Sequence, residues 1–316
     1  MKDNRMREDV DFLVKVAEHF PAKINSTSSI VAIKQIKEKL TEAQLALFRT
    51  TCFGKLLEMH ELKFSGQLVH HLLLRQIRSS SKSEMWFAVG GNTFRFSIQE
   101  FCLITGLACG PDPPVLEKKG DGSGSFRSSM LNGEVRYNNK TLEAIFKAAS
   151  SDSDEDMVKL ALLYFLETIL FGKDQKVYIS ALHVELLENL ETFNKYPWGR
   201  KCYETTLNSL QRDLRRMSQE YHTTSKKMVS NKKRKRHDNK EKDGIRQYAL
   251  HGFPYAFQIW ACEAIPAIGV EIANKFGTLL QRIVNWITPG TPDATNVIKL
   301  LDRKNTQVFK KLQPTP

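Results

Sequence analysis

The chain has 316 residues, of which 41% are hydrophobic, so it can bury a core in one large domain or two small ones. No apolar run reaches the roughly 18 residues of a membrane-spanning helix, and Met1–Arg7 is too polar for a secretory signal. These features exclude a membrane-spanning protein, and the formal net charge of +12 favours acidic partners such as nucleic acid.

Helical spacing dominates the first third of the chain. Thr41 and Gln44 have the spacing of a capping box, in which each side chain satisfies a backbone amide of the other residue. Ser65 is the expected N-cap of a strongly apolar helix. We expect residues 1–50 to form a helical extension. The predicted helices cover residues 7–20, 30–40, 41–48 and 66–77.

Residues 85–96 predict a β-hairpin that leads directly into a buried helix. The two apolar segments favour strands, and Gly90 and Gly91 between them reach positive φ at low cost, so the chain can reverse there. Ser97 and Glu100 then have the spacing of a second capping box. An apolar helix over residues 98–107 should follow.

Polar segments interrupt the remaining helices. Residues 110–140 are rich in Gly, Pro, Ser and Asn, and residues 223–250 are strongly polar, so we expect both to be mobile loops. Residues 291–316 are expected to form a flexible tail. The segment 279–287 is the last that we expect in the core. Further predicted helices cover residues 141–149, 157–171, 178–193, 202–221, 254–265, 268–276 and 296–302.

Together these elements predict one mainly α-helical fold. The expected architecture is a single multi-helix domain over residues 51–290, with one small β-hairpin at about 85–96 packed on the helices. The four tryptophans each lie within an apolar pattern, so we expect core packing rather than base stacking. Arg95 is expected either to pair with a buried carboxylate or to contact a partner.

The cysteines and histidines predict no metal site and no cofactor. The five cysteines are odd in number, widely separated and without a C-x-x-C pair, which predicts neither a disulfide framework nor a zinc finger. This usage favours a reducing intracellular compartment. His70 and His71 would point about 100° apart on a helix, so both cannot face one ion. The cysteines are Cys52, Cys102, Cys109, Cys202 and Cys262.

Several sequence blocks resemble a known family. They include Leu62–His70, the segment from Gly90 to Gly110, Tyr196–Arg200 and Gly252–Pro266. The chain is similar over about residues 53–286 to the plant domain of unknown function nineteen-eighty-five, found in proteins related to Mutator-like transposable elements. The matching residues expected to be structural are Gly90, Gly91, Arg95, Phe96, Ser97, Glu100, Phe101, Gly106, Leu107, Cys109, Gly110, Pro197, Trp198, Gly199 and Arg200.

In that family the domain often precedes a SUMO-protease-like (Ulp-type) cysteine peptidase domain. Such an enzyme needs a thiolate beside a histidine. In sequence order, its signature resembles a His-Trp pair, then an Asp, and then a Gln that lies several residues before Asp-Cys-Gly. Here no His precedes a Trp, and the sole Cys-Gly is Cys109-Gly110, which follows Ala108. We therefore predict a non-enzymatic chain with no catalytic residue. The alternative is the non-catalytic N-terminal portion of a SUMO-protease-like peptidase.

The sharpest functional signal is the basic run Lys232-Lys233-Arg234-Lys235-Arg236. Residues 226–243 hold nine Lys/Arg and three Asp/Glu, and nine minus three gives +6, half of the total charge of +12. Five consecutive cations resemble a nuclear-import signal and can also neutralise phosphates without reading sequence. The plainer alternative is a solvated charge run.

From these features we predict an interaction domain of transposon origin, located in the nucleus or otherwise in the cytoplasm. Its expected partners are a nuclear-import receptor, non-specifically bound nucleic acid and an unidentified protein.

Overall fold

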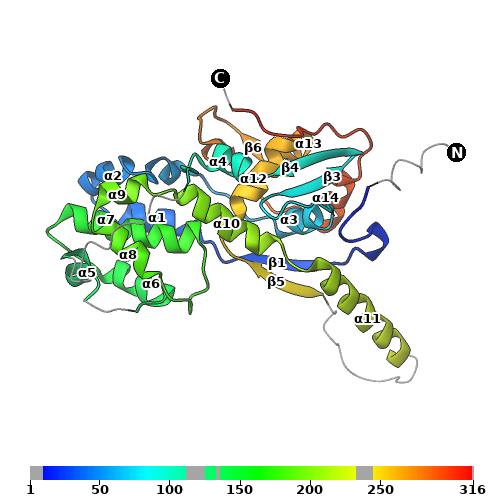
Figure 1. Ribbon diagram of the computed structural model, residues 1–316, viewed down its shortest axis with the longest axis horizontal. Helices are drawn as coiled ribbons and strands as arrows, with labels where there is room; N and C mark the ends of the chain where they lie inside the picture. The colour runs from blue at the N-terminus through cyan, green and yellow to red at the C-terminus, as the bar shows by residue number, and fades with distance from the viewer. Residues whose placement is uncertain (1–9, 112–124, 133–135, 233–244, 315–316) are drawn as a thin grey trace.

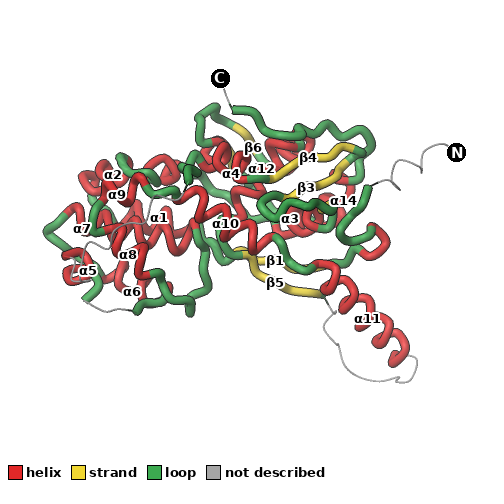
Figure 2. The backbone as a smooth tube through the Cα atoms, viewed as in Figure 1, coloured by secondary structure: helices red, strands yellow, loops and turns green. Residues whose placement is uncertain are grey.

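The computed structural model describes residues 10–111, 125–132, 136–232 and 245–314, which form an elongated, mainly helical fold (Figure 1). The predicted mainly α-helical class is confirmed, and one continuous hydrophobic core links all parts of the molecule. Small sheets lie toward one end of the molecule, and helices fill the other (Figure 2). Within the described residues, each helix is too short or too polar to cross a bilayer.

The helical end is built around α7 (Asp154–Phe165). Every residue from Met157 to Phe165 is buried, and the helix continues as a π-helical turn over Leu166–Leu170. Ser153 accepts a hydrogen bond from the amide of Asp156, as expected of an N-cap. Around α7 lie α1 (Val31–Lys39), α2 (Glu42–Arg49), α5 (Ser125–Met130), α6 (Asn139–Ala148), α8 (Ala181–Leu187) and α9 (Leu190–Lys195).

The other end contains the predicted hairpin. Strands β3 (Met85–Val89) and β4 (Asn92–Phe96) are antiparallel, and Gly90 and Gly91 connect them with φ angles of 59° and 85°. Both angles fall in the left-handed region, which glycine adopts without strain. A further strand that the sequence did not predict, β2 (Gln76–Ile77), pairs with β3 to give the order β2-β3-β4.

The hairpin packs on α12 (Pro254–Ala264) through aromatic side chains. Phe94 stacks on Trp260 with ring centroids 5.1 Å apart, and Phe87 and Phe96 contact the same indole. Packing around a fully buried tryptophan fixes which face of the hairpin points inward. The remaining helices here are α3 (Gly66–Leu73), α4 (Ile98–Thr105), α13 (Pro266–Ile272) and α14 (Ala294–Leu301).

Both predicted capping boxes are confirmed. Thr41 and Gln44 open α2, and Ser97 and Glu100 open α4, each pair bonding reciprocally to the other's backbone amide. Ser65 accepts from the amide of Leu68 at the start of α3. The starts of these helices could therefore be predicted from the sequence, because each N-capping signal spans only four residues.

Of the helices predicted in residues 1–50, those over 30–40 and 41–48 are confirmed as α1 and α2, and the one over 7–20 was wrong. In place of a helix over 7–20, the described part of this segment has only a 3-10 turn at Val16–Glu18. It is followed by strand β1 (Ala22–Ser26), which is parallel to β5 (Arg246–Leu250). The pairing joins residues more than 200 positions apart, so no local pattern could reveal it. Residues 1–9 lie outside the described part.

Two long predicted helices are each divided in two. The expected helix 178–193 is split into α8 and α9, with Asn189 capping the second through the amide of Thr192. The expected helix 202–221 becomes α10 (Trp198–Leu210) and α11 (Leu214–Lys232). Of the expected mobile loop 223–250, residues 223–232 instead continue α11, which extends away from the body (Figure 1), and residues 246–250 form β5. Residues 233–244 are outside the described part.

The segment after residue 290 differs from the expected flexible tail. Helix α14 buries Val297, Leu300 and Leu301, and Asp302 just after it forms an ion pair with the buried Arg75 at 2.8 Å. The chain then returns to the hairpin, where the amide of Arg95 donates to the carbonyl of Lys310. Apolar burial and these contacts fasten the segment to the body.

Two more expectations need correction or fall outside the described residues. In the segment 279–287, expected in the core, Ile283, Val284 and Trp286 are buried but Leu279 and Leu280 are exposed. The expected loop 110–140 contains the helix α5, and its residues 112–124 and 133–135 lie outside the described part. The β6 (Asn274–Lys275) and β7 (Trp286–Ile287) strands form a third small sheet.

Candidate functional site

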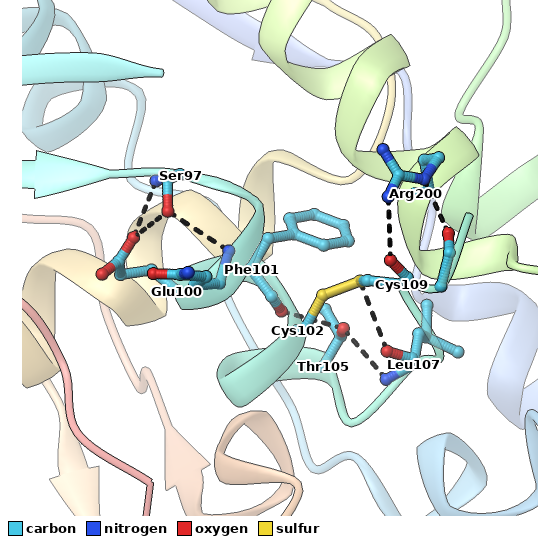
Figure 3. Close-up of a disulfide and its surroundings, with 10 residues drawn as sticks. Ser97, Glu100, Phe101, Cys102, Thr105, Leu107, Cys109 and Arg200 are labelled. Carbon is cyan, nitrogen blue, oxygen red and sulfur yellow. Dashed lines mark hydrogen bonds between the residues drawn. A yellow bond between two sulfur atoms is a disulfide. The ribbon is translucent and has the colours of Figure 1, made fainter. Parts of the chain in front are cut away.

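While Gly90 and Gly91 form the hairpin turn, most of the family-like residues lie at the two ends of helix α4. At its start the amide of Ser97 donates to the Glu100 carboxylate at 2.9 Å, and the Ser97 hydroxyl donates to the same oxygen at 2.5 Å (Figure 3). Glu100 is fully buried. The guanidinium of Arg95 contacts its other oxygen at 3.2 Å and Glu84 at 3.4 Å. Arg95 therefore neutralises a buried carboxylate, which is a structural role.

At its other end α4 stops at Thr105 because Gly106 follows in a left-handed conformation with φ of 71°. The hydroxyl of Thr105 donates to Phe101 and accepts from the amide of Leu107, which holds the turn. A residue with a side chain would be strained at position 106. The turn brings the chain back alongside the helix it has just left.

This return joins Cys102 on α4 to Cys109 in a disulfide (Figure 3). Their Cα atoms are 6.4 Å apart, within the range that a disulfide spans. The expectation that the cysteines form no disulfide is thus corrected. The reason is the Gly106 turn, which brings together two cysteines seven positions apart. Cys109 lies beyond the helix end, in the loop after it.

The start of α10 closes over this loop. The amide of Gly199 donates to the carbonyl of Ala108 at 2.9 Å, and Arg200 donates to the carbonyls of Gly110 at 2.6 Å and Cys109 at 3.2 Å. A Cβ at position 199 would lie 2.6 Å from the Cys109 sulfur, so only glycine fits. Two blocks that are 90 residues apart in sequence therefore form one contact (Figure 3).

Trp198 anchors that contact in the core. It is 1% exposed, and its indole Nε1 donates to the carbonyl of Phe193 at 2.8 Å. The rings of Tyr196, Phe193 and His183 surround it with centroid distances of 4.5, 4.9 and 5.4 Å. These contacts match the expected packing role. Among the family-like residues, Phe96 and Phe101 are buried in the same core, and Pro197 precedes α10.

A buried ionic cluster that sequence reasoning missed lies beside Trp198. Glu167, on the π-helical turn, is fully buried and contacts Nδ1 of His183, and Lys173 approaches it at 3.1 Å. Burial opposes the charge of Glu167, but the hydrogen bond and charge of His183, followed by the charge of Lys173, hold its pKa below the usual value. One sequence signal was present, since Glu167 is the one charged residue in the mainly apolar segment 160–171.

The π-helical turn explains how this carboxylate can be buried. It changes which side chains face inward after Phe165, and Glu167 then meets His183 of α8. Phe171 stacks on the imidazole with ring centroids 5.0 Å apart. The cluster thus joins the end of α7 to α8, and the contacts of His183 and Lys173 compensate Glu167.

The remaining thiols and imidazoles are poorly placed for nucleophilic chemistry. Burial raises the pKa of Cys52 and of Cys262 to about 12, and it raises the pKa of Cys202 well above its ordinary value. The thiolate needed for attack is therefore disfavoured at these three positions. The fully buried His70 bonds to the carbonyl of Phe20 at 2.6 Å. In residues 10–111, 125–132, 136–232 and 245–314, no group of His, Cys, Asp and Glu has metal-binding geometry.

The basic run is not part of this arrangement. Lys232 is the last residue of α11, while Lys233, Arg234, Lys235 and Arg236 lie outside the described residues. Helix α11 leaves the body at the end opposite α7 (Figure 1). The structure therefore brings most of the family-like residues together around α4 and places the start of the basic run elsewhere.

Comparison with known families identifies the segment that holds α4. Residues 73–209 match the model of the family described as Domain of unknown function (DUF1985). The matched segment runs from α3 to α10 and includes the disulfide and the Trp198–Arg200 contact. No curated protein and no solved structure matches the chain.

Proposed function

Because residues 73–209 belong to the DUF1985 family, we propose a role without catalysis for this chain: a nuclear interaction domain of transposon origin. The proposal includes non-specific nucleic-acid affinity through the basic run Lys232–Arg236. The observation that carries it is helix α11, which extends from the body and ends at the first cation of that run (Figure 1).

The root of α11 is firmly attached to the body. Leu214 and Ser218 are buried, and the Ser218 hydroxyl donates to the carbonyl of Glu18 at 2.6 Å. Tyr221 packs against Phe20 with ring centroids 6.0 Å apart. Because an α-helix rises about 1.5 Å per residue, Lys232 lies about 16 Å beyond Tyr221 along the axis. The attachment thus places the end of α11 at a distance from the body.

The anion at the root is already compensated. Glu220 contacts Arg216 at 2.9 Å and Arg246 of β5 at 3.5 Å. Lys226, which follows on the same helix, is exposed. A positively charged arm of this kind favours phosphate contacts, which give affinity without sequence preference.

The state of the cysteines supports the non-enzymatic part of the proposal. Cys109, the one cysteine followed by glycine, is bonded to Cys102. The partly buried thiol of Cys52 and the buried thiols of Cys202 and Cys262 have raised pKa values. A cysteine peptidase needs a thiolate beside a histidine, and each of the five sulfurs is either bonded or held in the thiol form.

The test of nucleic-acid affinity is a salt series of duplex DNA binding with the full chain. In one variant all five cations of the run become Gln, which removes charge and keeps length. Since each phosphate contact contributes about 0.9 to the slope of log K against log salt, we expect the magnitude of the slope to fall by up to about 4.5 for the five cations. The matched control replaces five exposed lysines elsewhere with Gln: Lys23, Lys34, Lys37, Lys55 and Lys140.

An equal loss of slope in both variants would show that overall charge, rather than the run, carries the affinity. Unchanged binding in the run variant would place the DNA surface on the folded body. A fluorescent fusion of the full chain tests the nuclear part. We expect the run variant to leave the nucleus and the control to stay, and nuclear retention of the run variant would contradict the import role.

A further inference from the structure

The disulfide between Cys102 and Cys109 lies where a thiol reagent can approach it. Both cysteines are partly exposed, and Ala108 and Gly110 on either side of Cys109 are exposed. Of the three free cysteines, by contrast, two are buried. Thiol–disulfide exchange requires a thiolate to approach one sulfur of the bond, so access decides which disulfides exchange. This bond is therefore open to exchange in the folded chain.

The chain around the bond is held by contacts that do not involve sulfur. The left-handed turn at Gly106 is covered by Gln281, whose Cγ would lie 2.2 Å from a Cβ at that position. On the other side, Gly199 and Arg200 donate to the carbonyls of residues 108–110 at 2.6 to 3.2 Å. These contacts keep the two cysteines close to each other without the bond. Each thiol then meets the other at a high effective concentration, which favours re-formation of the disulfide.

The bond also closes only a short loop. Seven positions separate the two cysteines, and the stabilisation that a disulfide gives increases with the length of the loop it closes. The turn itself has its own hydrogen bonds, since the Thr105 hydroxyl donates to the carbonyl of Phe101 and accepts from the amide of Leu107. The chain can therefore lose this bond without unfolding, as a reversible switch requires.

Breaking the bond acts on the start of α10. The two sulfurs then have to move from bonded to non-bonded separation. The Cys109 sulfur lies directly against the backbone of Gly199, where a Cβ would be only 2.6 Å from it. Its displacement is therefore passed to α10. The contact that it disturbs first is the hydrogen bond from the Gly199 amide to the carbonyl of Ala108, at 2.9 Å.

We propose that Cys102 and Cys109 form a redox switch that controls how the loop 106–110 docks on α10 (Figure 3). In the dithiol state the contact with Gly199 is loosened, and oxidation forms the bond and tightens the contact. Disulfides of reducing compartments are usually transient and serve redox sensing, which agrees with the nuclear location proposed above. The inference goes beyond the proposed function and does not depend on it.

The exchange partner is a low-molecular-weight thiol such as glutathione. Its thiolate attacks one sulfur, so that the protein S–S bond breaks, a mixed disulfide forms and the other cysteine leaves as a thiolate. A second glutathione thiolate attacks the mixed disulfide, which releases the first cysteine and yields glutathione disulfide. The two protein thiolates take up the two protons that the reagent thiols lost. Glutathione disulfide reverses both steps and oxidises the pair.

The test uses the full chain equilibrated either with reduced glutathione or with glutathione disulfide. Alkylation followed by mass spectrometry measures the state of Cys102 and Cys109, and hydrogen exchange is followed at the Gly199 amide. We expect a dithiol in the first buffer and the disulfide in the second, with amide exchange at least about fivefold faster in the dithiol state. A bond that resists reduced glutathione, a dithiol that resists glutathione disulfide, or equal exchange rates would each overturn the proposal.

Two variants separate the switch from a general effect of the buffers. Cys102→Ala removes the bond, so exchange at the Gly199 amide should be fast in both buffers. Cys52→Ser is the matched control, because Cys52 is also partly exposed but free, and it should keep the full difference between the buffers. Thermal unfolding shows that both variants remain folded. A redox response that persists in Cys102→Ala, or is lost in Cys52→Ser, would contradict the assignment to this pair.

Discussion

Glu100 and Glu167 are both fully buried, yet they are compensated in opposite ways. Glu100 is bound by Ser97 and Arg95, which lie three and five positions before it. Glu167 depends on His183, sixteen positions later on another helix, and on Lys173. The comparison shows that a carboxylate can enter the core either through a local motif or through tertiary packing, and only the first identifies its partners in the local sequence.

The two sites should also differ in how they tolerate change. The Glu100 carboxylate keeps its bonds to the amide and hydroxyl of Ser97 even without Arg95, and it lies at the positive end of α4. Glu167 has no comparable cap, since its described contacts are the side chains of His183 and Lys173. We therefore expect the tertiary site to be the more sensitive one.

The largest effect is expected from His183→Leu. The change removes the hydrogen bond to Glu167 and leaves a buried carboxylate with Lys173 alone. Breaking a buried pair in this way costs about 4 kcal/mol of unfolding free energy, to be measured by urea denaturation.

The double variant Glu167→Met/His183→Leu is the control for this change. Without the buried charge it should recover most of the loss, and a double-mutant cycle gives the coupling. If His183→Leu lowers the unfolding free energy by less than about 1 kcal/mol, Glu167 does not depend on His183, and the proposed difference from Glu100 is wrong.

The second-largest expected effect is a loss of stability at low pH. It comes from a buried histidine, His70, which is held neutral, whereas Glu100 and Glu167 are buried charges. Burial lowers the pKa of His70 to about 4 from its ordinary value of 6.5. The unfolded chain therefore binds more protons between these values, so stability is complete above pH 6.5 and is lost as pH falls toward 4. A shift of this size corresponds to a loss on the order of 3 kcal/mol.

Urea unfolding from pH 7 to pH 4 measures this loss, with His70→Phe as the comparison. The pKa of the neighbouring His71 and of His19 is also lowered, mainly by burial, and both should add to the acid sensitivity. We expect the pH dependence to be shallower in His70→Phe than in the natural chain. Equal slopes would show that His70 does not titrate in this range.

Features set by neighbouring residues were predictable from the sequence. The capping boxes of α2 and α4, the Gly90-Gly91 turn and the proline at the start of α12 each depend on a few consecutive residues. The parallel pairing of β1 with β5 and the docking of α14 depend on distant contacts. Those contacts overrode the local signals for a helix before Pro21 and for a mobile tail.

The candidate site shows the same division. The capping pair Ser97 and Glu100 could be named in advance, and so could the resemblance that grouped them with Trp198. The disulfide required the left-handed turn at Gly106, and the Glu167 cluster required a π-helical turn. A single charge within an apolar run marked Glu167, but nothing in the local sequence named His183 as its partner.

The smallest effect is expected from Arg95→Met, which removes the ionic partner of Glu100 and keeps the aliphatic stem. Because the two contacts from Ser97 remain, the cost should be about 2 kcal/mol, half of that expected for His183→Leu. Arg78→Met is the matched control. Its ion pair with Asp11 at 3.0 Å is exposed, so it should change the unfolding free energy by less than about 0.5 kcal/mol.

The outcome of Arg95→Met decides whether the local motif protects the carboxylate. If urea unfolding shows a loss as large as that of His183→Leu, the Ser97 cap does not sustain Glu100 by itself. The two buried carboxylates would then be equally dependent on a distant charge. The other outcome is an intermediate loss of unfolding free energy in Arg95→Met, and a larger loss when Ser97→Ala is added. That result would show that the Ser97 cap stabilises the Glu100 carboxylate, because Ser97→Ala removes the hydroxyl contact.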